Sequence, residues 1–167
     1  MNIAIVGATG NVGRKLLEVL ERTNFEFNEI YLIASDKSVG KKITFKNKNY
    51  PVIGLSDFDF GKVKLAFFSA GSSIAEKWAP IAAKKAIVID NSKYFRMDKE
   101  IPLVVPEVNG EALKAYKNKN IIANANCSTI QLVLALKPLH DQFKIKRVIV
   151  STYQSVSGAG KVHINEV

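Results

Sequence analysis

The sequence has 167 residues, 47% of them hydrophobic and 23% charged, which is enough for one domain with a core and gives no sign of disorder. Its 24 Lys and Arg against 15 Asp and Glu give a formal charge of +9, but the basic residues are scattered without interleaved aromatic residues, so we expect no nucleic-acid partner. No apolar run approaches the roughly 20 residues of a membrane span, and the single cysteine indicates a reducing compartment. We therefore expect a cytoplasmic protein with no membrane partner.

Apolar strands and helices are predicted to alternate along the chain. The strands are expected at 2–6, 29–34, 43–45, 50–52, 65–69, 86–89, 103–105 and 121–123, with 43–45 and 50–52 forming a hairpin. Helical spacing of apolar residues follows the first strand and recurs at 74–82 and 128–139. Because most strands are apolar throughout, the pattern predicts an α/β fold with a Rossmann-like, doubly wound, mostly parallel sheet. A longer strand at 144–153 and a loop at 155–160 are predicted to begin a second α+β domain.

A glycine-rich turn joins the first predicted strand to the first helix. Its glycines, Gly7, Gly10 and Gly13, have the spacing of a dinucleotide-binding turn. Backbone amides and the positive end of the helix converge at such a turn, where a pyrophosphate can bind. The alternative is a tight turn without a ligand. The predicted cofactor contacts in this turn are Gly7, Thr9, Gly10, Asn11 and Val12.

The turn after the second strand is predicted to contact the adenine ribose. Asp36 can accept hydrogen bonds from a free 2'-hydroxyl and would favour NAD. Lys37, with the hydroxyls of Ser35 and Ser38, can hold a 2'-phosphate and would favour NADP. We predict NADP, with NAD as the less favoured cofactor, and an ordinary polar turn as the alternative without a ligand.

Cys127 is predicted to lie on a strand-to-helix turn, at the start of the helix that follows 121–123. Backbone amides at a helix N-terminus stabilise a thiolate and can also face an oxyanion on an attacked carbonyl. A thiol nucleophile beside a nicotinamide predicts an acyl-thioester intermediate that is reduced or formed by hydride transfer. The alternative is a buried structural cysteine.

Neither histidine is a convincing acid/base for this chemistry. His140 is expected at the far end of the helix that Cys127 begins, about 18 Å away at a rise of about 1.5 Å per residue. His163 lies near the end of the sequence, and we assign it no role. No metal site is predicted.

The sequence resembles aspartate-β-semialdehyde dehydrogenase over essentially its whole length. The segments that carry the resemblance are 7–13 (GATGNVG), 69–73 (SAGSS), 90–92 (DNS) with 95–98 (FRMD), 104–109 (VVPEVN), 126–131 (NCSTIQ) and 151–160 (STYQSVSGAG). The resemblance implies reduction of aspartyl phosphate to the semialdehyde with NADPH and release of phosphate, in lysine, diaminopimelate, threonine and methionine biosynthesis. It also implies a homodimer.

The resemblance assigns roles to individual residues. Cys127 would be the nucleophile, Gln154 would orient the substrate beside Asn126, and Arg96 would bind phosphate or the acyl phosphate. The cofactor site would also include Lys37, Ser38, Gly71, Ser72, Ser157 and Gly158. These roles match a small-molecule substrate and phosphate as the binding partners.

The sequence departs from the family pattern in three ways. Ala125 replaces a proline before Asn126, which loosens the turn, and Lys37 replaces an arginine, which keeps the charge but loses a bidentate fork. The family's catalytic histidine and carboxylate-binding arginine lie later in the chain than residue 167. We therefore predict an NADP-binding domain over 1–126, and the catalytic helix with the truncated start of a substrate and dimerisation domain over 127–167.

Three functions remain open from the sequence. The favoured function is aspartate-semialdehyde dehydrogenase chemistry. The chain would then be a fragment of the enzyme, or one piece of a split enzyme with a complementary C-terminal polypeptide, and would be inactive alone. The second is an N-acetyl-γ-glutamyl-phosphate reductase, which shares the fold and thiol chemistry. The third is a nucleotide-binding module without catalysis.

Overall fold

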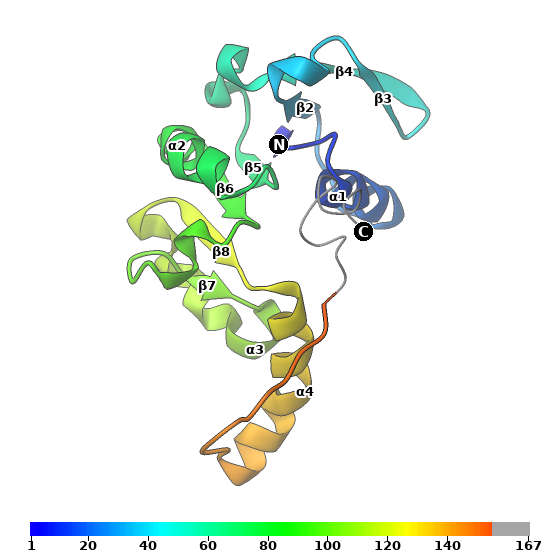
Figure 1. Cartoon of the computed structure of the whole chain (residues 1–167). Helices are drawn as coiled ribbons and strands as arrows, with labels where there is room; N and C mark the ends of the chain where they lie inside the picture. Colours follow the sequence, from blue (N-terminus) through cyan, green and yellow to red (C-terminus); the bar gives the residue numbers. More distant parts are fainter. Residues whose placement is uncertain (155–167) are drawn as a thin grey trace.

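The computed structural model describes residues 1–154, in which one mixed sheet runs through the centre (Figure 1). Its strand order in this part of the chain is β3-β4-β2-β1-β5-β6-β8-β7, and every neighbouring pair is parallel except β3 with β4. The strands are β1 (Ile3–Val6), β2 (Ile30–Ala34), β3 (Lys42–Phe45), β4 (Lys48–Gly54), β5 (Leu65–Phe68), β6 (Ile87–Asp90), β7 (Leu103–Val104) and β8 (Ile121–Asn124).

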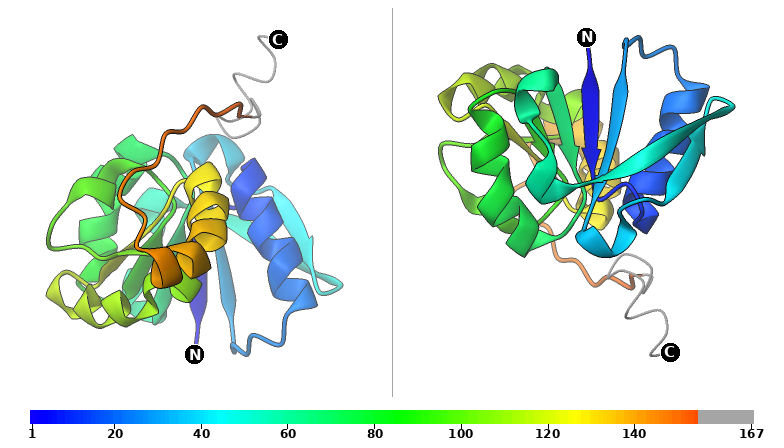
Figure 2. Two further views of the ribbon diagram at one scale, coloured as in Figure 1. Left: turned by 90° about the horizontal axis from the view of Figure 1, so that it is seen from below. Right: turned by 90° about the horizontal axis from the view of Figure 1, so that it is seen from above.

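Helices cover both faces of this sheet. The α-helices are α1 (Asn11–Arg22), α2 (Ser72–Ala83), α3 (Pro106–Asn109) and α4 (Cys127–Phe143), and the 3-10 helices are η1 (Asp36–Ser38), η2 (Leu55–Asp57), η3 (Phe60–Lys62), η4 (Tyr94–Met97) and η5 (Gly110–Asn118). Figure 2 shows α1 and α2 on opposite sides of the sheet. The predicted Rossmann-like α/β architecture is therefore present.

Two apolar clusters fill the space between sheet and helices, because successive side chains of a strand point to opposite faces. In β1, Ile3 and Ile5 pack on the side of α1, whereas Ala4 and Val6 pack on the side of α2. All four of these residues are completely buried. Burial on both faces explains why the central strands are apolar throughout.

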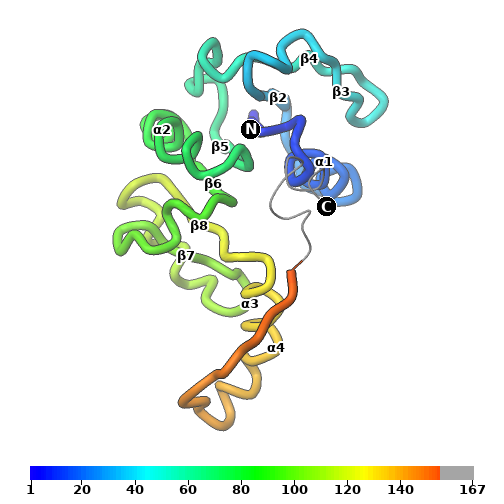
Figure 3. Tube along the Cα trace, in the orientation of Figure 1, coloured from blue at the N-terminus to red at the C-terminus, as the bar shows by residue number. Residues whose placement is uncertain are grey.

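The last helix differs from the rest of the fold. Although α4 has 17 residues and many are apolar, none of them is buried, and the helix extends away from the sheet (Figures 1 and 3). Lys144 then adopts a left-handed conformation (φ 55°), and the chain returns toward the sheet. Within the described residues, no helix is both long and apolar enough to cross a membrane.

The strand predicted at 144–153 is absent, so this prediction is wrong. Residues 144–154 form no helix and no strand, and every one of them except the half-buried Ile145 is exposed. A partly alternating pattern marks a segment suited to a sheet, but a strand also needs a neighbour to accept and donate its backbone hydrogen bonds. In residues 1–154 no strand pairs with this segment.

The other predicted elements differ only in their bounds. The hairpin is confirmed, with a tighter turn than expected in which Lys46 and Asn47 both have positive φ (47° and 59°). The strand predicted at 103–105 is reduced to two residues, and α4 begins one residue before and ends four residues after its predicted bounds. The predicted loop at 155–160 lies outside the described residues.

Candidate functional site

Most of the predicted site residues in the described part of the chain lie at one edge of the sheet. Because β1, β2, β5, β6 and β8 run parallel, their carboxyl ends meet at this edge, and the segment that follows each strand lies there. The chain leaves β1 toward β2 on one side and later returns to β5 on the other side. Ligands of open α/β sheets bind at such a topological switch point.

The glycine turn after β1 is tightly fitted to its neighbours. A Cβ on Gly13 would lie 2.3 Å from the carbonyl oxygen of Gly7, so helix α1 can approach the strand only with glycine at this position. Gly7 itself has φ +91°, and a Cβ there would lie 2.7 Å from the carbonyl oxygen of Ser69. Glycine at position 7 therefore permits the turn, and glycine at position 13 permits the close packing of α1 against it.

Several amides of this turn form no hydrogen bond within residues 1–154. The amides of Gly7 and Ala8 donate to the carbonyl of Ile33 (2.8 and 3.1 Å), and that of Gly10 donates to Gly7 (3.0 Å). Among the hydrogen bonds of residues 1–154, none uses the amide of Thr9, Asn11 or Val12. Open amides at a helix N-terminus suit a pyrophosphate, so the residues present fit a dinucleotide.

The segment predicted to contact the ribose lies beside this turn. Ser35 follows β2 directly, and Ile33 of the same strand accepts two amides of the glycine turn. Lys37 and Ser38 lie in η1, with Lys37 exposed. No ion pair involves Lys37 in the described part of the chain, so its ammonium is available to an anion.

The segment after β5 completes the cofactor side of the edge. The amide and the hydroxyl of Ser69 both donate to the carbonyl of Val6 (2.8 and 3.2 Å). Gly71 follows with φ +89° and is the N-cap of α2, and Ser72 is the first residue of that helix. The backbone bond to Val6 keeps this helix start next to the glycine turn.

Cys127 is the first residue of α4 and is exposed. Asn126 caps the helix, because its Oδ1 accepts the amides of Ser128 (3.0 Å) and Thr129 (3.4 Å). The strand order places β8 three strands from β1, which is about 14 Å at about 4.8 Å per strand. A dinucleotide on the glycine turn must therefore extend across the ends of β5 and β6 to reach the sulfur.

Arg96 lies in η4, half-buried, and holds the ends of two strands. Its Nε donates to the carbonyl of Asn124 (2.9 Å) and its Nη2 donates to the carbonyl of Asn91 (3.1 Å). The side chains of these two asparagines are joined by a hydrogen bond of 2.6 Å. Arg96 thus supports the strand end that leads to Cys127, in addition to the anion-binding role predicted from the sequence.

Asp90 is a fully buried carboxylate at the end of β6. Burial raises its pKa, although the hydroxyl and amide of Ser92 donate to its two oxygens (2.6 and 3.0 Å) and Arg96 lies nearby. Tyr94 follows, and its hydroxyl donates to Glu76 (3.0 Å), a hydrogen bond that raises the pKa of the tyrosine. This network joins η4, which carries Arg96, to β6 and α2.

Within residues 1–154, neither Gln154 nor His140 forms a hydrogen bond with the nucleophile. Gln154 is exposed in the segment that follows α4, and no hydrogen bond joins it to Cys127. His140 is exposed in the last turn of α4, at the opposite end from the cysteine. Ser157, Gly158 and His163 lie outside the described residues.

Comparison with known proteins places the chain in a family. A family model described as "Semialdehyde dehydrogenase, NAD binding domain" matches residues 2–116, and one described as "Semialdehyde dehydrogenase, dimerisation domain" matches 136–167. The chain belongs to the semialdehyde dehydrogenase family. This confirms the resemblance found in the sequence, while the domain boundary at 126/127 stays a prediction.

Two relatives show how much of the family protein the chain covers. It is 53% identical to aspartate-semialdehyde dehydrogenase 2 of Vibrio cholerae over 99% of this chain and 50% of the relative. It is 56% identical to the aspartate-semialdehyde dehydrogenase of Aquifex aeolicus over 99% of this chain and 49% of the relative. The chain therefore spans about half the length of the curated relatives it matches.

Solved structures of the family share the fold. The crystal structure of aspartate semialdehyde dehydrogenase II from Vibrio cholerae superposes with a TM-score of 0.95, at 54% identity, over 99% of this chain and 50% of that one. A structure of the Candida albicans enzyme with NADP gives a TM-score of 0.70 at 30% identity, over 85% of this chain and 47% of that one. These likenesses confirm the predicted fold class.

Asn91 and Asn124, for which the sequence predicted no role, connect Arg96 to the strand that leads into α4. A signal existed, because Asn91 follows one predicted apolar strand and Asn124 another, and the carboxyl ends of parallel strands meet at one edge. The strand order that makes β6 and β8 neighbours was needed to recognise it.

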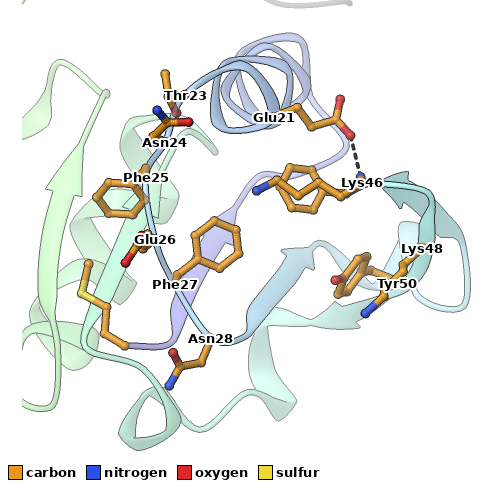
Figure 4. Close-up of a pocket in the computed structure, with 12 residues that line it drawn as sticks. Glu21, Thr23, Asn24, Phe25, Glu26, Phe27, Asn28, Lys46, Lys48 and Tyr50 are labelled. Carbon is orange, nitrogen blue, oxygen red and sulfur yellow. Dashed lines mark hydrogen bonds between the residues drawn. The ribbon is translucent and has the colours of Figure 1, made fainter.

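A separate hollow lies at the opposite edge of the sheet, between the loop 23–28, the end of α1 and the β3–β4 hairpin (Figure 4). Its volume is about 890 Å³, and no predicted site residue lines it. Successive rings of Phe25, Phe27, Phe45 and Tyr50 stand 6.1–6.2 Å apart, and Lys46 Nζ lies 5.5 Å from the ring of Phe27. These contacts attach the hairpin to the body of the domain.

Proposed function

We propose that this chain provides the cofactor-binding domain and the nucleophile of an aspartate-semialdehyde dehydrogenase. The reaction is reduction of L-aspartyl 4-phosphate by NADPH to L-aspartate 4-semialdehyde and phosphate, in the biosynthesis of lysine, diaminopimelate, threonine and methionine. The observation that carries the proposal is the position of Cys127, which is exposed at the first residue of a helix on the same sheet edge as the glycine turn. The relatives named aspartate-semialdehyde dehydrogenase support the choice of substrate.

In the proposed mechanism the Cys127 sulfur attacks the carbonyl carbon of aspartyl phosphate. The carbon–oxygen bond to the phosphate breaks, phosphate leaves, and an acyl thioester remains on the sulfur. The amide of Cys127, the one amide in the first turn of α4 without a hydrogen bond in residues 1–154, and the positive end of the helix stabilise both the thiolate and the oxyanion that forms during the attack. Arg96 binds the phosphate with the N–H groups that do not donate to Asn91 or Asn124.

NADP is the proposed cofactor. When bound, its reduced form supplies the hydride that converts the thioester to an aldehyde and returns the sulfur to a thiolate. The chain's own contribution is the glycine turn for the pyrophosphate and Lys37, with Ser35 and Ser38, for the 2'-phosphate. A relative from Candida albicans crystallised with NADP supports this assignment.

Further parts of the proposal concern the complete enzyme. Steady-state turnover needs a general acid/base, and His140 stands at the wrong end of α4 to provide it, so we expect negligible turnover by this chain alone. A homodimer, to which residues 136–167 contribute, and a complementary C-terminal polypeptide belong to the same proposal. So does a cytoplasmic location, which suits an exposed free thiol.

The acylation step tests the nucleophile directly. The chain is incubated with L-aspartyl 4-phosphate, and an acyl adduct on Cys127 is sought by intact mass spectrometry, with Cys127→Ser as the control. We expect an adduct on the wild-type chain that hydroxylamine removes and that the serine variant lacks. NADPH binding without an adduct would instead favour a nucleotide-binding module, and an adduct formed only from N-acetyl-γ-glutamyl phosphate would favour the related reductase.

The cofactor assignment has its own test. Loss of charge-assisted contacts to the 2'-phosphate in Lys37→Ala should weaken NADPH binding by about tenfold to a hundredfold and leave NADH binding unchanged. Binding is followed by nucleotide fluorescence. Lys62→Ala, which removes an exposed lysine that precedes β5 at the opposite edge, is the matched control. Equal NADPH affinity in the two variants would contradict the assignment.

A further inference from the structure

Asn91 forms hydrogen bonds both with Arg96 and with the strand end that precedes Cys127. Its carbonyl oxygen accepts a hydrogen bond from Arg96 Nη2 (3.1 Å), and its side-chain Oδ1 accepts one from Asn124 Nδ2 (2.6 Å). Asn124 is the last residue of β8, three positions before Cys127. One residue therefore holds the phosphate-binding guanidinium and also the strand end that leads to the nucleophile.

The geometry of Arg96 allows one side chain to hold the two backbone carbonyls and to bind an anion at the same time. A guanidinium is planar and carries five N–H groups in fixed directions. Nε and Nη2 share one edge of the plane, and this edge faces the carbonyls of Asn124 and Asn91. The edge formed by Nη1 and the second N–H of Nη2 remains for an anion. The two carbonyls thus determine the direction in which Arg96 presents its free fork.

The side chain of Asn91 keeps those two carbonyls together. Asn91 and Asn124 are half-buried at the ends of the paired strands β6 and β8. The hydrogen bond between their side chains bridges the two strands at the point where the ladder between them ends at Asp90 and Ala123. Among the hydrogen bonds of residues 1–154, only those of the Arg96 side chain link the two strand ends besides this one.

We infer that Asn91 is a positioning residue for the nucleophile site: it fixes the orientation of Arg96 and the approach of β8 to Cys127 without touching the substrate. The inference rests on the proposed function, in which Cys127 is acylated and Arg96 binds phosphate. It goes beyond that function by assigning a role to a residue that binds no reactant.

The test compares Asn91→Ala with two other variants of the chain. Asn91→Asp keeps an oxygen that can accept from Asn124, and Asn2→Ala is the matched control, because it removes one asparagine hydrogen bond, to the carbonyl of Lys62, at the opposite edge. For each variant we measure the rate of Cys127 alkylation by iodoacetamide and the concentration of inorganic phosphate that half-maximally changes this rate. Circular dichroism verifies that each variant is folded.

We expect Asn91→Ala to lower the alkylation rate and to raise the half-effective phosphate concentration by about threefold to tenfold each, the range expected for one lost hydrogen bond. Asn91→Asp should restore the alkylation rate, and Asn2→Ala should match the wild type. If Asn91→Ala does not fold, Asn124→Ala removes the other half of the same hydrogen bond and must show the same two changes.

The inference would be overturned if Asn91→Ala, or Asn124→Ala in its place, gave the same result as Asn2→Ala in both measurements. An alkylation rate of the wild-type chain that does not respond to phosphate would count against the proposed function of Arg96. In that case the comparison of alkylation rates alone still decides whether Asn91 positions the start of α4.

Discussion

The sheet with its flanking helices and the helix α4 with the segment after it differ in how they use apolar residues. Every buried hydrophobic residue of the described chain lies between Ile3 and Ala125. In α4 no residue is buried, and Phe143 at its end is 69% exposed. The candidate site lies where these two regions meet, since Asn126 and Cys127 belong to the start of α4 and the rest of the site belongs to the sheet edge.

This difference shows that the site depends on the sheet and only on the first turn of α4. Asn126 accepts two amides of that turn, and Arg96 and Asn91 form hydrogen bonds with Asn124 on the strand that leads into it. Among the hydrogen bonds of residues 1–154, none joins the rest of the helix to the sheet. The chemistry proposed for Cys127 therefore needs an intact sheet and an intact helix start. It should tolerate changes near the end of α4.

The largest expected effect is on the free energy of unfolding, which should respond to an aromatic substitution in the sheet but not to one in α4. Phe68 in β5 is 1% exposed, and Phe68→Ala should lower the free energy of unfolding by about 3–5 kcal/mol through lost burial and a cavity. Phe143→Ala in α4 should change it by less than about 0.5 kcal/mol, because that ring is already in contact with water. Urea unfolding measures both. Similar losses in the two variants would show that α4 belongs to the same cooperative core.

A smaller effect is expected at the glycine turn. In Gly13→Ala the new Cβ collides with the carbonyl of Gly7, which should cost about 1–3 kcal/mol and move the open amides away from the cofactor. NADPH affinity and the urea midpoint should both fall. Gly110→Ala is the control, because a Cβ there meets no atom within 4 Å and φ is −56°. Unchanged NADPH affinity in Gly13→Ala would show that this turn is not part of the cofactor site.

The smallest expected effect is on how the stability of the fold depends on pH. A carboxyl group in the sheet and one in α4 should change this dependence in opposite directions. Burial raises the pKa of Asp90, so the folded chain binds that proton more tightly than the unfolded chain, and the carboxyl favours folding at acid pH and opposes it above its folded pKa. The hydrogen bond from Lys137 lowers the pKa of the exposed Asp141, which therefore favours folding above its unfolded pKa and loses this contribution as pH falls.

The pair Asp90→Asn and Asp141→Asn tests these signs. Relative to the wild type, Asp90→Asn should gain stability as pH rises from about 3 to 7, and Asp141→Asn should lose a little over the same range. The measurement is the urea midpoint at each pH. A stability difference from the wild type that is independent of pH for Asp90→Asn would contradict the raised pKa.

Local sequence was enough to predict the parts of the fold in which one short segment determines its own structure. The glycine spacing of 7–13 predicted a strand, a turn and a helix, and the structure adds the contact of Gly13 with Gly7 that explains it. Cys127 was likewise placed at a helix start from the segment around it. For 144–153 the same reasoning failed, because a strand depends on a partner that the segment itself does not encode.

The polar network was harder to predict because it depends on strand order. Arg96 was assigned to an anion from its chemistry, but its contacts with the carbonyls of Asn91 and Asn124 follow from the adjacency of β6 and β8. The two asparagines are 33 positions apart in the sequence, and η4, β7, α3 and η5 lie between them. Periodicity and composition carry no information about such a pairing.

The carbonyl of Ile33, which accepts two amides of the glycine turn, has a consequence for affinity. Strand β2 holds the turn in its shape before any nucleotide arrives, and the left-handed glycine needs no rearrangement. A preorganised loop loses little conformational entropy when it is occupied, so more of the interaction energy with the pyrophosphate remains as affinity. The entropy of ordering this loop was spent when the sheet folded.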